Sequence, residues 1–97
     1  MFVVSIQYKA DLSVVDKLIP EHIRFLEKFY EKGNFVVSGR KVPRTGGIIL
    51  ASAPSKEALN NILAEDPFHQ ANVASYEVIE FVPSKYAEGF EAIEKLT

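Results

Sequence analysis

Four stretches of the chain have the composition and alternation of β-strands. Residues 2–8 place large apolar and aromatic side chains on one face and smaller, partly polar side chains on the other. Residues 48–53 are apolar on both faces, which indicates that both sides of this strand are covered. The pattern predicts strands at residues 2–8, 35–40, 48–53 and 74–82, with a turn or loop over residues 41–47.

The stretch 13–32 has the spacing of an amphipathic helix. Ser13 is suited to cap its first turn, and Gly33-Asn34 ends it in the usual way. Pro20 lies inside this pattern. It either kinks one helix or begins the main helix after a short turn.

Two further helices are predicted in the second half of the chain. Ser55 caps the first of them, and a turn at Asp66-Pro67 ends it. Ser84 caps a C-terminal helix that follows the last strand. The apolar stripe of this last helix is predicted to consist of Tyr86, Phe90, Ile93 and Leu96.

The order of predicted elements is β-α-β-β-α-β followed by a helix. This order indicates an α+β fold of the ferredoxin-like type, with helices on one face of an antiparallel sheet. The apolar residues of strand 48–53 cannot all face the helices, and a second copy of the chain is the simplest cover for the open face. We therefore expect a homodimer packed sheet to sheet, or a higher oligomer built from it. A pocket near this interface is predicted beside the small and polar residues of the open face, Ser5, Gln7, Ser38 and Arg40.

Composition narrows the class of protein. The length of 97 residues predicts one domain over residues 1–97, and a net charge of -2 argues against a nucleic-acid-binding face. The absence of cysteine excludes a thiolate nucleophile and a zinc–thiolate site, and two histidines are too few for a multi-histidine metal site. No metal or cofactor is expected. The chain shows neither a signal-peptide pattern nor an apolar run of membrane-spanning length, so a cytoplasmic protein without a membrane partner is expected.

Two polar residues contrast with their surroundings. His22 lies on the apolar arc of helix 13–32, and Asp66 lies at a helix C-terminus, where the dipole disfavours a negative charge. Each has an ordinary explanation: His22 as a core histidine with one hydrogen bond, and Asp66, followed by Pro67, as the N-cap of a short turn. An imidazole and a carboxylate are also the usual parts of a general acid–base pair. Capping and pairing are compatible, because a carboxylate has two oxygens.

Three other polar residues have simpler interpretations. His69 is interpreted as a surface histidine. Arg40 and Arg44 are interpreted as solvated charges, with an anion clamp for a carboxylate-bearing substrate as the alternative.

Several landmarks occur in a characteristic order along the chain: His22-x-x-Phe25-Leu26, Gly33, Ser38-Gly39, Gly46-Gly47, Asp66-Pro67-Phe68 and Glu77-Val78. Together they resemble the YciI-like family, which is part of the dimeric α/β-barrel group that includes muconolactone isomerase. The resemblance covers roughly residues 1–83, and its most specific part is Asp-Pro-Phe with an upstream histidine. It implies a ferredoxin-like dimer whose cleft holds a His–Asp pair, and acid–base chemistry without a generally assigned reaction.

Carried over to this chain, the resemblance implies that His22 and Asp66 are the catalytic residues. Ser38 and Gly39 match the segment that often lines the cleft of family members. Arg40 departs from the family pattern, in which many members have proline, and is suited to bind an anionic group or to alter the cleft. The predicted substrate-binding residues are Ser38, Gly39, Arg40 and Phe68.

The sequence therefore predicts a cofactor-independent enzyme that transfers a proton on a small molecule near a dimer interface. Isomerase, hydrolase and lyase chemistry all fit this prediction. The alternative is a non-catalytic module that binds a metabolite or only supports dimerisation. Asp66→Asn separates the two, because it should abolish turnover in the first case and leave ligand affinity and, apart from the lost cap, stability nearly unchanged in the second.

Overall fold

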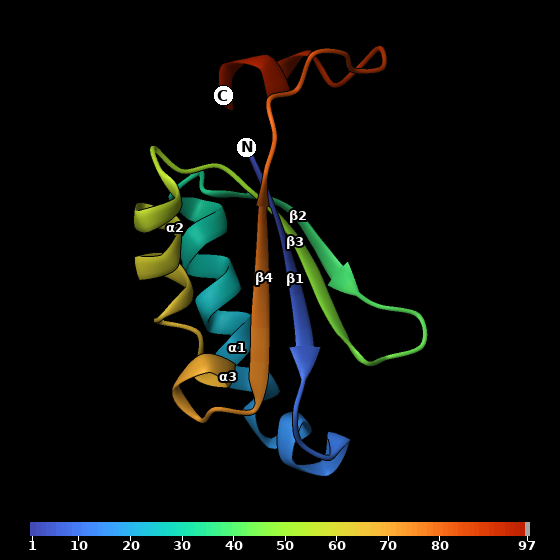
Figure 1. Cartoon of the computed structure of the whole chain (residues 1–97), viewed down its shortest axis with the longest axis vertical. Coiled ribbons are helices and arrows are strands. Elements are labelled where there is room, and N and C mark those ends of the chain that lie inside the picture. Colours follow the sequence, from blue (N-terminus) through green and yellow to red (C-terminus); the bar gives the residue numbers. More distant parts are fainter. Residues whose placement is uncertain (97) are drawn as a thin grey trace.

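The computed structural model describes residues 1–96 and has two layers, with helices covering one face of a four-stranded antiparallel sheet (Figure 1). This is the predicted ferredoxin-like plan. The elements in chain order are β1 Phe2–Tyr8, α1 Leu12–Glu31, β2 Phe35–Arg40, β3 Gly46–Ala51, α2 Lys56–Leu63, α3 Pro67–Gln70, β4 Ala74–Glu80 and the 3₁₀ helix η1 Glu91–Leu96.

The core lies between the sheet and the helices. The strand order is β2-β3-β1-β4, so β1 is central and pairs with β3 on one side and β4 on the other. Phe2, Val4 and Ile6 alternate along β1 and are buried against the helical layer. Each large apolar side chain buried in this way contributes about 1.5–3 kcal/mol. The helices add Val15, Phe25, Phe29, Leu59, Leu63 and Phe68 to the same core.

Helix α1 runs without interruption through Pro20. The alternative in which Pro20 begins the main helix is therefore wrong. The prediction that Ser13 caps the helix is also wrong, because Asp11 is the N-cap and its side chain makes no capping bond. Proline removes one backbone donor, but the exposed position of Pro20 lets the rest of the helix continue around it. The predicted C-terminus holds, since the helix ends at Glu31.

Strand β3 begins at Gly46, two residues before the predicted start. Gly46 pairs with Gln7, and a Cβ atom on Gly46 would lie 1.7 Å from the carbonyl oxygen of Ile6. Gly46 and Gly47 therefore belong to β3 rather than to the predicted loop. At Gly46, only glycine permits this close approach of the two backbones.

A bulge in β2 corrects the predicted position of the pocket. Strict alternation from the buried Phe35 would place Ser38 and Arg40 on the open face. The register shift between Phe35 and Val37 instead pairs Ser38 with Ile49 and Arg40 with Gly47, residues that face the helices. One extra residue moves every later side chain to the opposite face. Ser38 and Arg40 therefore lie on the helical side of the sheet, away from Ser5 and Gln7.

The C-terminal segment differs most from its prediction. Strand β4 ends at Glu80, opposite the first residue of β1, so Val82 has no strand with which to pair. The predicted helix starting at Ser84 is wrong, since the helical part is the short η1. Gly89 has a φ of 95°, which interrupts a regular helix, and Tyr86 and Phe90 remain exposed. The segment lies beyond the end of the sheet (Figure 1).

The open face of the sheet carries several apolar side chains that no helix covers. Val37 is 56% exposed and Ile79 is 51% exposed, and Ile48, Val3 and Leu50 lie on the same face.

None of the helices within residues 1–96 has the length and hydropathy that crossing a membrane requires.

Candidate functional site

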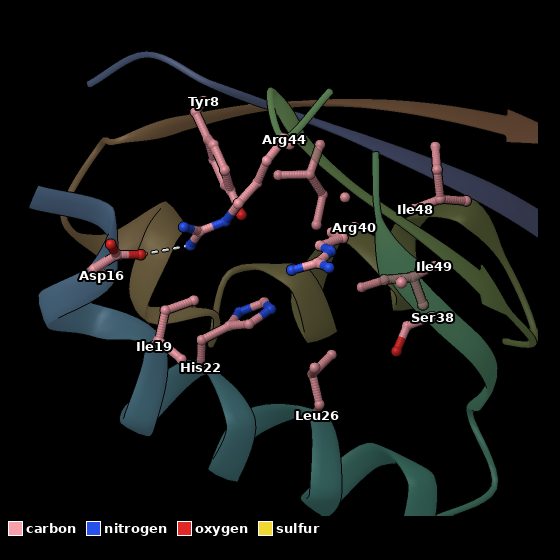
Figure 2. Close-up of a pocket in the computed structure, with 14 residues that line it drawn as sticks. Tyr8, Asp16, Ile19, His22, Leu26, Ser38, Arg40, Arg44, Ile48 and Ile49 are labelled. Carbon is pink, nitrogen blue, oxygen red and sulfur yellow. Dashed lines mark hydrogen bonds and ion pairs between the residues drawn. The ribbon is translucent and has the colours of Figure 1, made fainter. Parts of the chain in front are cut away.

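A cavity of about 500 Å³ lies between α1 and the β2–β3 side of the sheet (Figure 2). This volume is in the range of small-molecule sites. Its wall is mainly aliphatic, and its polar groups are concentrated on His22, Asp16, Arg40 and Arg44. The lining residues are Ile6, Tyr8, Asp16, Ile19, His22, Leu26, Ser38, Gly39, Arg40, Arg44, Gly46, Gly47, Ile48 and Ile49.

His22 and Asp66 form a direct contact, with His22 Nδ1 2.8 Å from Asp66 Oδ1. The His22 side chain is 13% exposed and that of Asp66 is completely buried. An ionised carboxylate can only accept hydrogen bonds, which assigns the proton of this bond to Nδ1. The other ring nitrogen, Nε2, is then free to give or take a proton, and the ring forms part of the cavity wall.

The local sequence explains how a carboxylate is held at this point. Asp66 is the N-cap of α3, and Oδ1 accepts a hydrogen bond of 3.0 Å from the backbone N–H of Phe68. Pro67 occupies the first turn of α3, where its fixed φ suits the helix and its missing N–H costs nothing. The ordinary explanation for Asp66 is therefore correct, and the cap coexists with the histidine contact.

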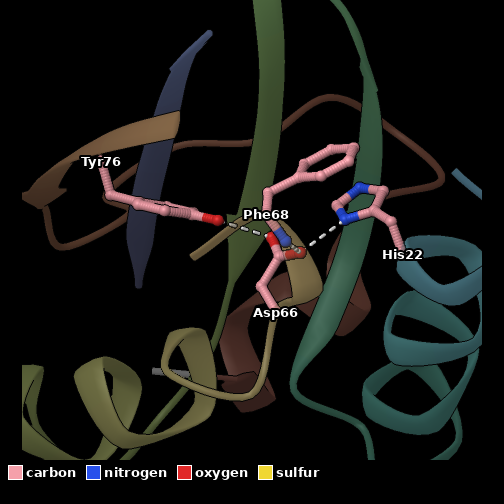
Figure 3. A network of polar contacts seen from close by, with 4 residues as sticks. All are labelled: His22, Asp66, Phe68 and Tyr76. Carbon is pink, nitrogen blue, oxygen red and sulfur yellow. Dashed lines mark hydrogen bonds and ion pairs between the residues drawn. The ribbon is translucent and has the colours of Figure 1, made fainter. Parts of the chain in front are cut away.

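Tyr76 holds the second oxygen of the same carboxylate. Its hydroxyl donates to Asp66 Oδ2 at 2.8 Å, from the side opposite to His22 (Figure 3). Burial and the neighbouring Asp66 charge raise the pKa of Tyr76 well above its ordinary value. The tyrosine therefore stays protonated and remains a donor.

The orientation of the imidazole is also fixed by Phe68. The rings of His22 and Phe68 stack with centroids 4.1 Å apart and planes 13° apart. Phe68 is 2% exposed and is not among the cavity-lining residues. The structure therefore places Phe68 behind His22, where it supports the ring, rather than in the wall where a substrate-binding residue was expected.

Two arginines bring positive charge to the cavity. Arg44 Nη2 lies 2.5 Å from Asp16 Oδ1, and this hydrogen bond raises the pKa of Arg44 above its ordinary value. The Arg40 guanidinium has no hydrogen-bond or ion-pair partner within residues 1–96 and extends into the cavity (Figure 2). The Ser38 hydroxyl lies 2.6 Å from that of Tyr30, so it is already engaged within the protein.

The structure brings most of the predicted site together. His22, Ser38, Gly39 and Arg40 line one cavity, and Asp66 supports His22 from behind. His69 is exposed and lies outside this cavity, as expected of a surface histidine.

The sequence favours a core or rim position for Tyr76, with donation of its hydroxyl to a ligand as the alternative, and it gives no sign of a bond to Asp66. The signal available was its position on the apolar face of strand 74–82, which a core residue shares. Its contact with Asp66 depends on where α3 packs against β4, and a hydropathy pattern does not report that packing.

No group of three or more histidine, cysteine, aspartate or glutamate side chains suited to a metal ion occurs in the described part of the chain, residues 1–96.

Comparison with known proteins gives three findings. Residues 1–82 match the YCII-related domain. The fold is similar to that of 5-chloro-2-hydroxyhydroquinone dehydrochlorinase from Burkholderia phenoliruptrix, solved in complex with 2,5-dihydroxybenzoquinone, with a TM-score of 0.71. The two sequences are 19% identical, and the alignment covers 84% of this chain and 94% of that chain. The chain matches none of the curated proteins with which it was compared.

The structural similarity supports the fold, and the domain match carries the assignment because it includes β1 through β4 and every cavity-lining residue. The chain belongs to the YCII-related domain family.

Proposed function

We propose that this protein is an enzyme in which His22 Nε2 transfers a proton to or from a small molecule bound in the cavity. The observation that supports this proposal is the 2.8 Å contact between His22 Nδ1 and the buried Asp66. It fixes one nitrogen of the imidazole and leaves the other at the cavity wall. A carboxylate that holds a histidine in one tautomer is a recurrent feature of general bases.

The cavity favours a substrate with an apolar body and an anionic oxygen. Aliphatic residues such as Ile19, Leu26 and Ile49 form most of the wall. The Arg40 guanidinium supplies a positive charge that no acidic residue in the described chain neutralises. Planar guanidinium groups bind carboxylates and similar anions through paired hydrogen bonds. Arg40 is therefore the proposed anion-binding residue.

The same groups support a complete proton-transfer step. Nε2 takes a proton from a carbon next to a carbonyl, and the C–H electron pair moves to form an enolate. Arg40 stabilises the negative charge on the enolate oxygen. In an isomerisation, His22 returns the proton to a different carbon. In an elimination, the electron pair forms a double bond instead, and a leaving group departs with its own bonding electrons.

The structural neighbour agrees with this chemical class. It is named a dehydrochlorinase, and removing hydrogen chloride from a substrate requires a group that accepts a proton. It binds 2,5-dihydroxybenzoquinone, a planar ring whose hydroxyl groups are conjugated to carbonyls and are therefore acidic. We propose the same broad class for this chain, a small planar molecule with an acidic hydroxyl or carboxylate group.

Calorimetric titration with 2,5-dihydroxybenzoquinone tests the cavity and its charge. We expect the wild-type protein to bind this probe and Arg40→Ala to bind it roughly tenfold or more weakly, the loss expected for a charged hydrogen bond. Lys41→Ala is the matched control, since Lys41 neighbours Arg40 but does not line the cavity. An absence of wild-type binding, or an equal loss in both variants, would count against the proposed substrate class.

A further inference from the structure

The two oxygens of Asp66 are used unequally. Oδ1 accepts from the Phe68 backbone N–H at 3.0 Å and contacts His22 Nδ1 at 2.8 Å. Oδ2 has one partner in the described chain, the Tyr76 hydroxyl at 2.8 Å. Because Asp66 is completely buried, water cannot readily replace a missing partner at Oδ2.

The different numbers of partners on the two Asp66 oxygens affect the orientation of the His22 ring. Rotation about the last bond of an aspartate side chain is loosely restricted, so donors on one oxygen alone leave the carboxylate plane poorly fixed. Donors on both oxygens fix the plane. Figure 3 shows His22 and Tyr76 reaching the carboxylate from opposite sides. The position of Oδ1, and with it the His22 ring, therefore depends on the Tyr76 bond.

We propose that Tyr76 is a positioning residue that fixes the Asp66 carboxylate and thereby holds His22 as the Nδ1–H tautomer with Nε2 directed into the cavity. This inference rests on the proposed function, because the direction of Nε2 matters to catalysis only if that atom transfers a proton. It adds a third member to the His22–Asp66 pair.

The location of Tyr76 suits this role. Tyr76 lies on β4 directly opposite Ile6 of the central strand, and Ile6 lines the cavity. His22 lies on α1 and Asp66 precedes α3, so the chain of contacts joins the helical layer to the sheet. Since the raised pKa keeps the hydroxyl protonated, Tyr76 donates over the whole neutral pH range.

Nitrogen NMR of the His22 ring tests the inference without a substrate. At a pH where the ring is neutral, the wild type should show Nδ1–H and unprotonated Nε2. In Tyr76→Phe, we expect the ratio of the Nδ1–H to the Nε2–H tautomer to fall by at least about threefold, a typical effect of losing one hydrogen bond. Tyr8→Phe is the matched control, since Tyr8 contacts Phe68 by ring packing and makes no bond to Asp66.

An unchanged tautomer ratio in a folded Tyr76→Phe protein would overturn the inference and leave Tyr76 as a link between β4 and α3. If Tyr76→Phe does not fold, a ring-fluorinated tyrosine at position 76 replaces it, since fluorine makes the hydroxyl a stronger donor and keeps the ring. The His22 nitrogen shifts should then move, and unmoved shifts would again overturn the inference. A tautomer that depends on Tyr76, in a protein with no proton-transfer activity, would contradict the proposed function and leave the positioning intact.

Discussion

At the residue scale, the Asp66 side chain combines a structural role with the chemical role proposed for it beside His22. Oδ1 caps α3 through Phe68 and contacts His22, while Oδ2 accepts from Tyr76. All three partners donate to Asp66, and an ionised carboxylate accepts all three on its two oxygens. An amide has one acceptor oxygen and no charge, so the hydrogen bonds to the Phe68 N–H, His22 and Tyr76 cannot all be kept as charge-assisted bonds.

Asp66→Asn is therefore expected to destabilise the fold by about 1.5–3 kcal/mol, the contribution of a hydrogen bond to a charged group. Urea unfolding of the wild type and the variant measures this difference. Asp11→Asn is the control, because Asp11 caps α1 without a side-chain bond and should change stability by less than about 0.5 kcal/mol. Equal stability of wild type and Asp66→Asn would show that the three contacts do not act on one ionised carboxylate.

The stability of the protein is predicted to be sensitive to alkaline pH because of Tyr76. Its pKa is raised in the folded state, so the unfolded chain loses this proton at a lower pH than the folded chain does. The contribution to stability is complete below the unfolded pKa of about 10 and is lost as pH rises above that value. We expect the free energy of unfolding to fall above about pH 10, and to fall less steeply in Tyr76→Phe. Urea unfolding across this range measures both slopes, and identical slopes would contradict the prediction.

Some of these residues can be recognised from the sequence and others cannot. His22 and Asp66 conflict with their local surroundings, and this conflict is visible in the amino-acid pattern alone. Tyr76 agrees with its surroundings, as an aromatic residue on the apolar face of a strand. Its role depends on long-range packing, which local patterns do not encode.

At the element scale, hydrophobic periodicity predicts the order of strands and helices. It does not predict which side chains of β2 face the helices. The register shift between Phe35 and Val37 moves Ser38 and Arg40 from the open face to the cavity. A bulge leaves little trace in a pattern of six residues, so alternation gives the wrong face. The prediction of a C-terminal helix with a buried apolar stripe is wrong for a different reason. The short helix η1 and the segment before it have little core to pack against.

The start of β3 gives a prediction at this scale. Gly46→Ala places a Cβ atom 1.7 Å from the Ile6 carbonyl oxygen, where the start of β3 pairs with β1. We expect a loss of at least about 3 kcal/mol or a failure to fold, because neither strand can move away without breaking the pairing. Thermal and urea unfolding provide the measurement. Gly39→Ala is the control, since nothing lies within 4 Å of its Cβ position, and comparable damage in both variants would exclude the close approach as the cause.

At the scale of the whole molecule, the uncovered sheet face predicts self-association. Val37, Ile48 and Ile79 expose apolar surface on one face of a chain of 97 residues. A second copy packed on this face would bury these side chains and complete a dimeric α/β barrel.

Analytical ultracentrifugation tests this prediction with one pair of variants. We expect the wild type to sediment as a dimer or a larger assembly, and Val37→Asp to shift it toward monomer because a charge would be buried at the interface. Val14→Asp is the control, since Val14 is 42% exposed on the outer side of α1. A wild-type monomer at every concentration, or equal dissociation of both variants, would contradict a sheet-to-sheet dimer.

The central claim is that His22 Nε2 transfers a proton to and from a molecule in the cavity. The most direct measurement is NMR detection of solvent deuterium entering a panel of small carbonyl compounds that carry an acidic hydroxyl or carboxylate group. We expect the wild type and His69→Gln to catalyse exchange in at least one compound, and His22→Gln to slow it by about 100-fold or more, the usual contribution of a general base. Exchange that persists unchanged in His22→Gln, or exchange no faster with wild-type protein than in buffer alone, would contradict the claim.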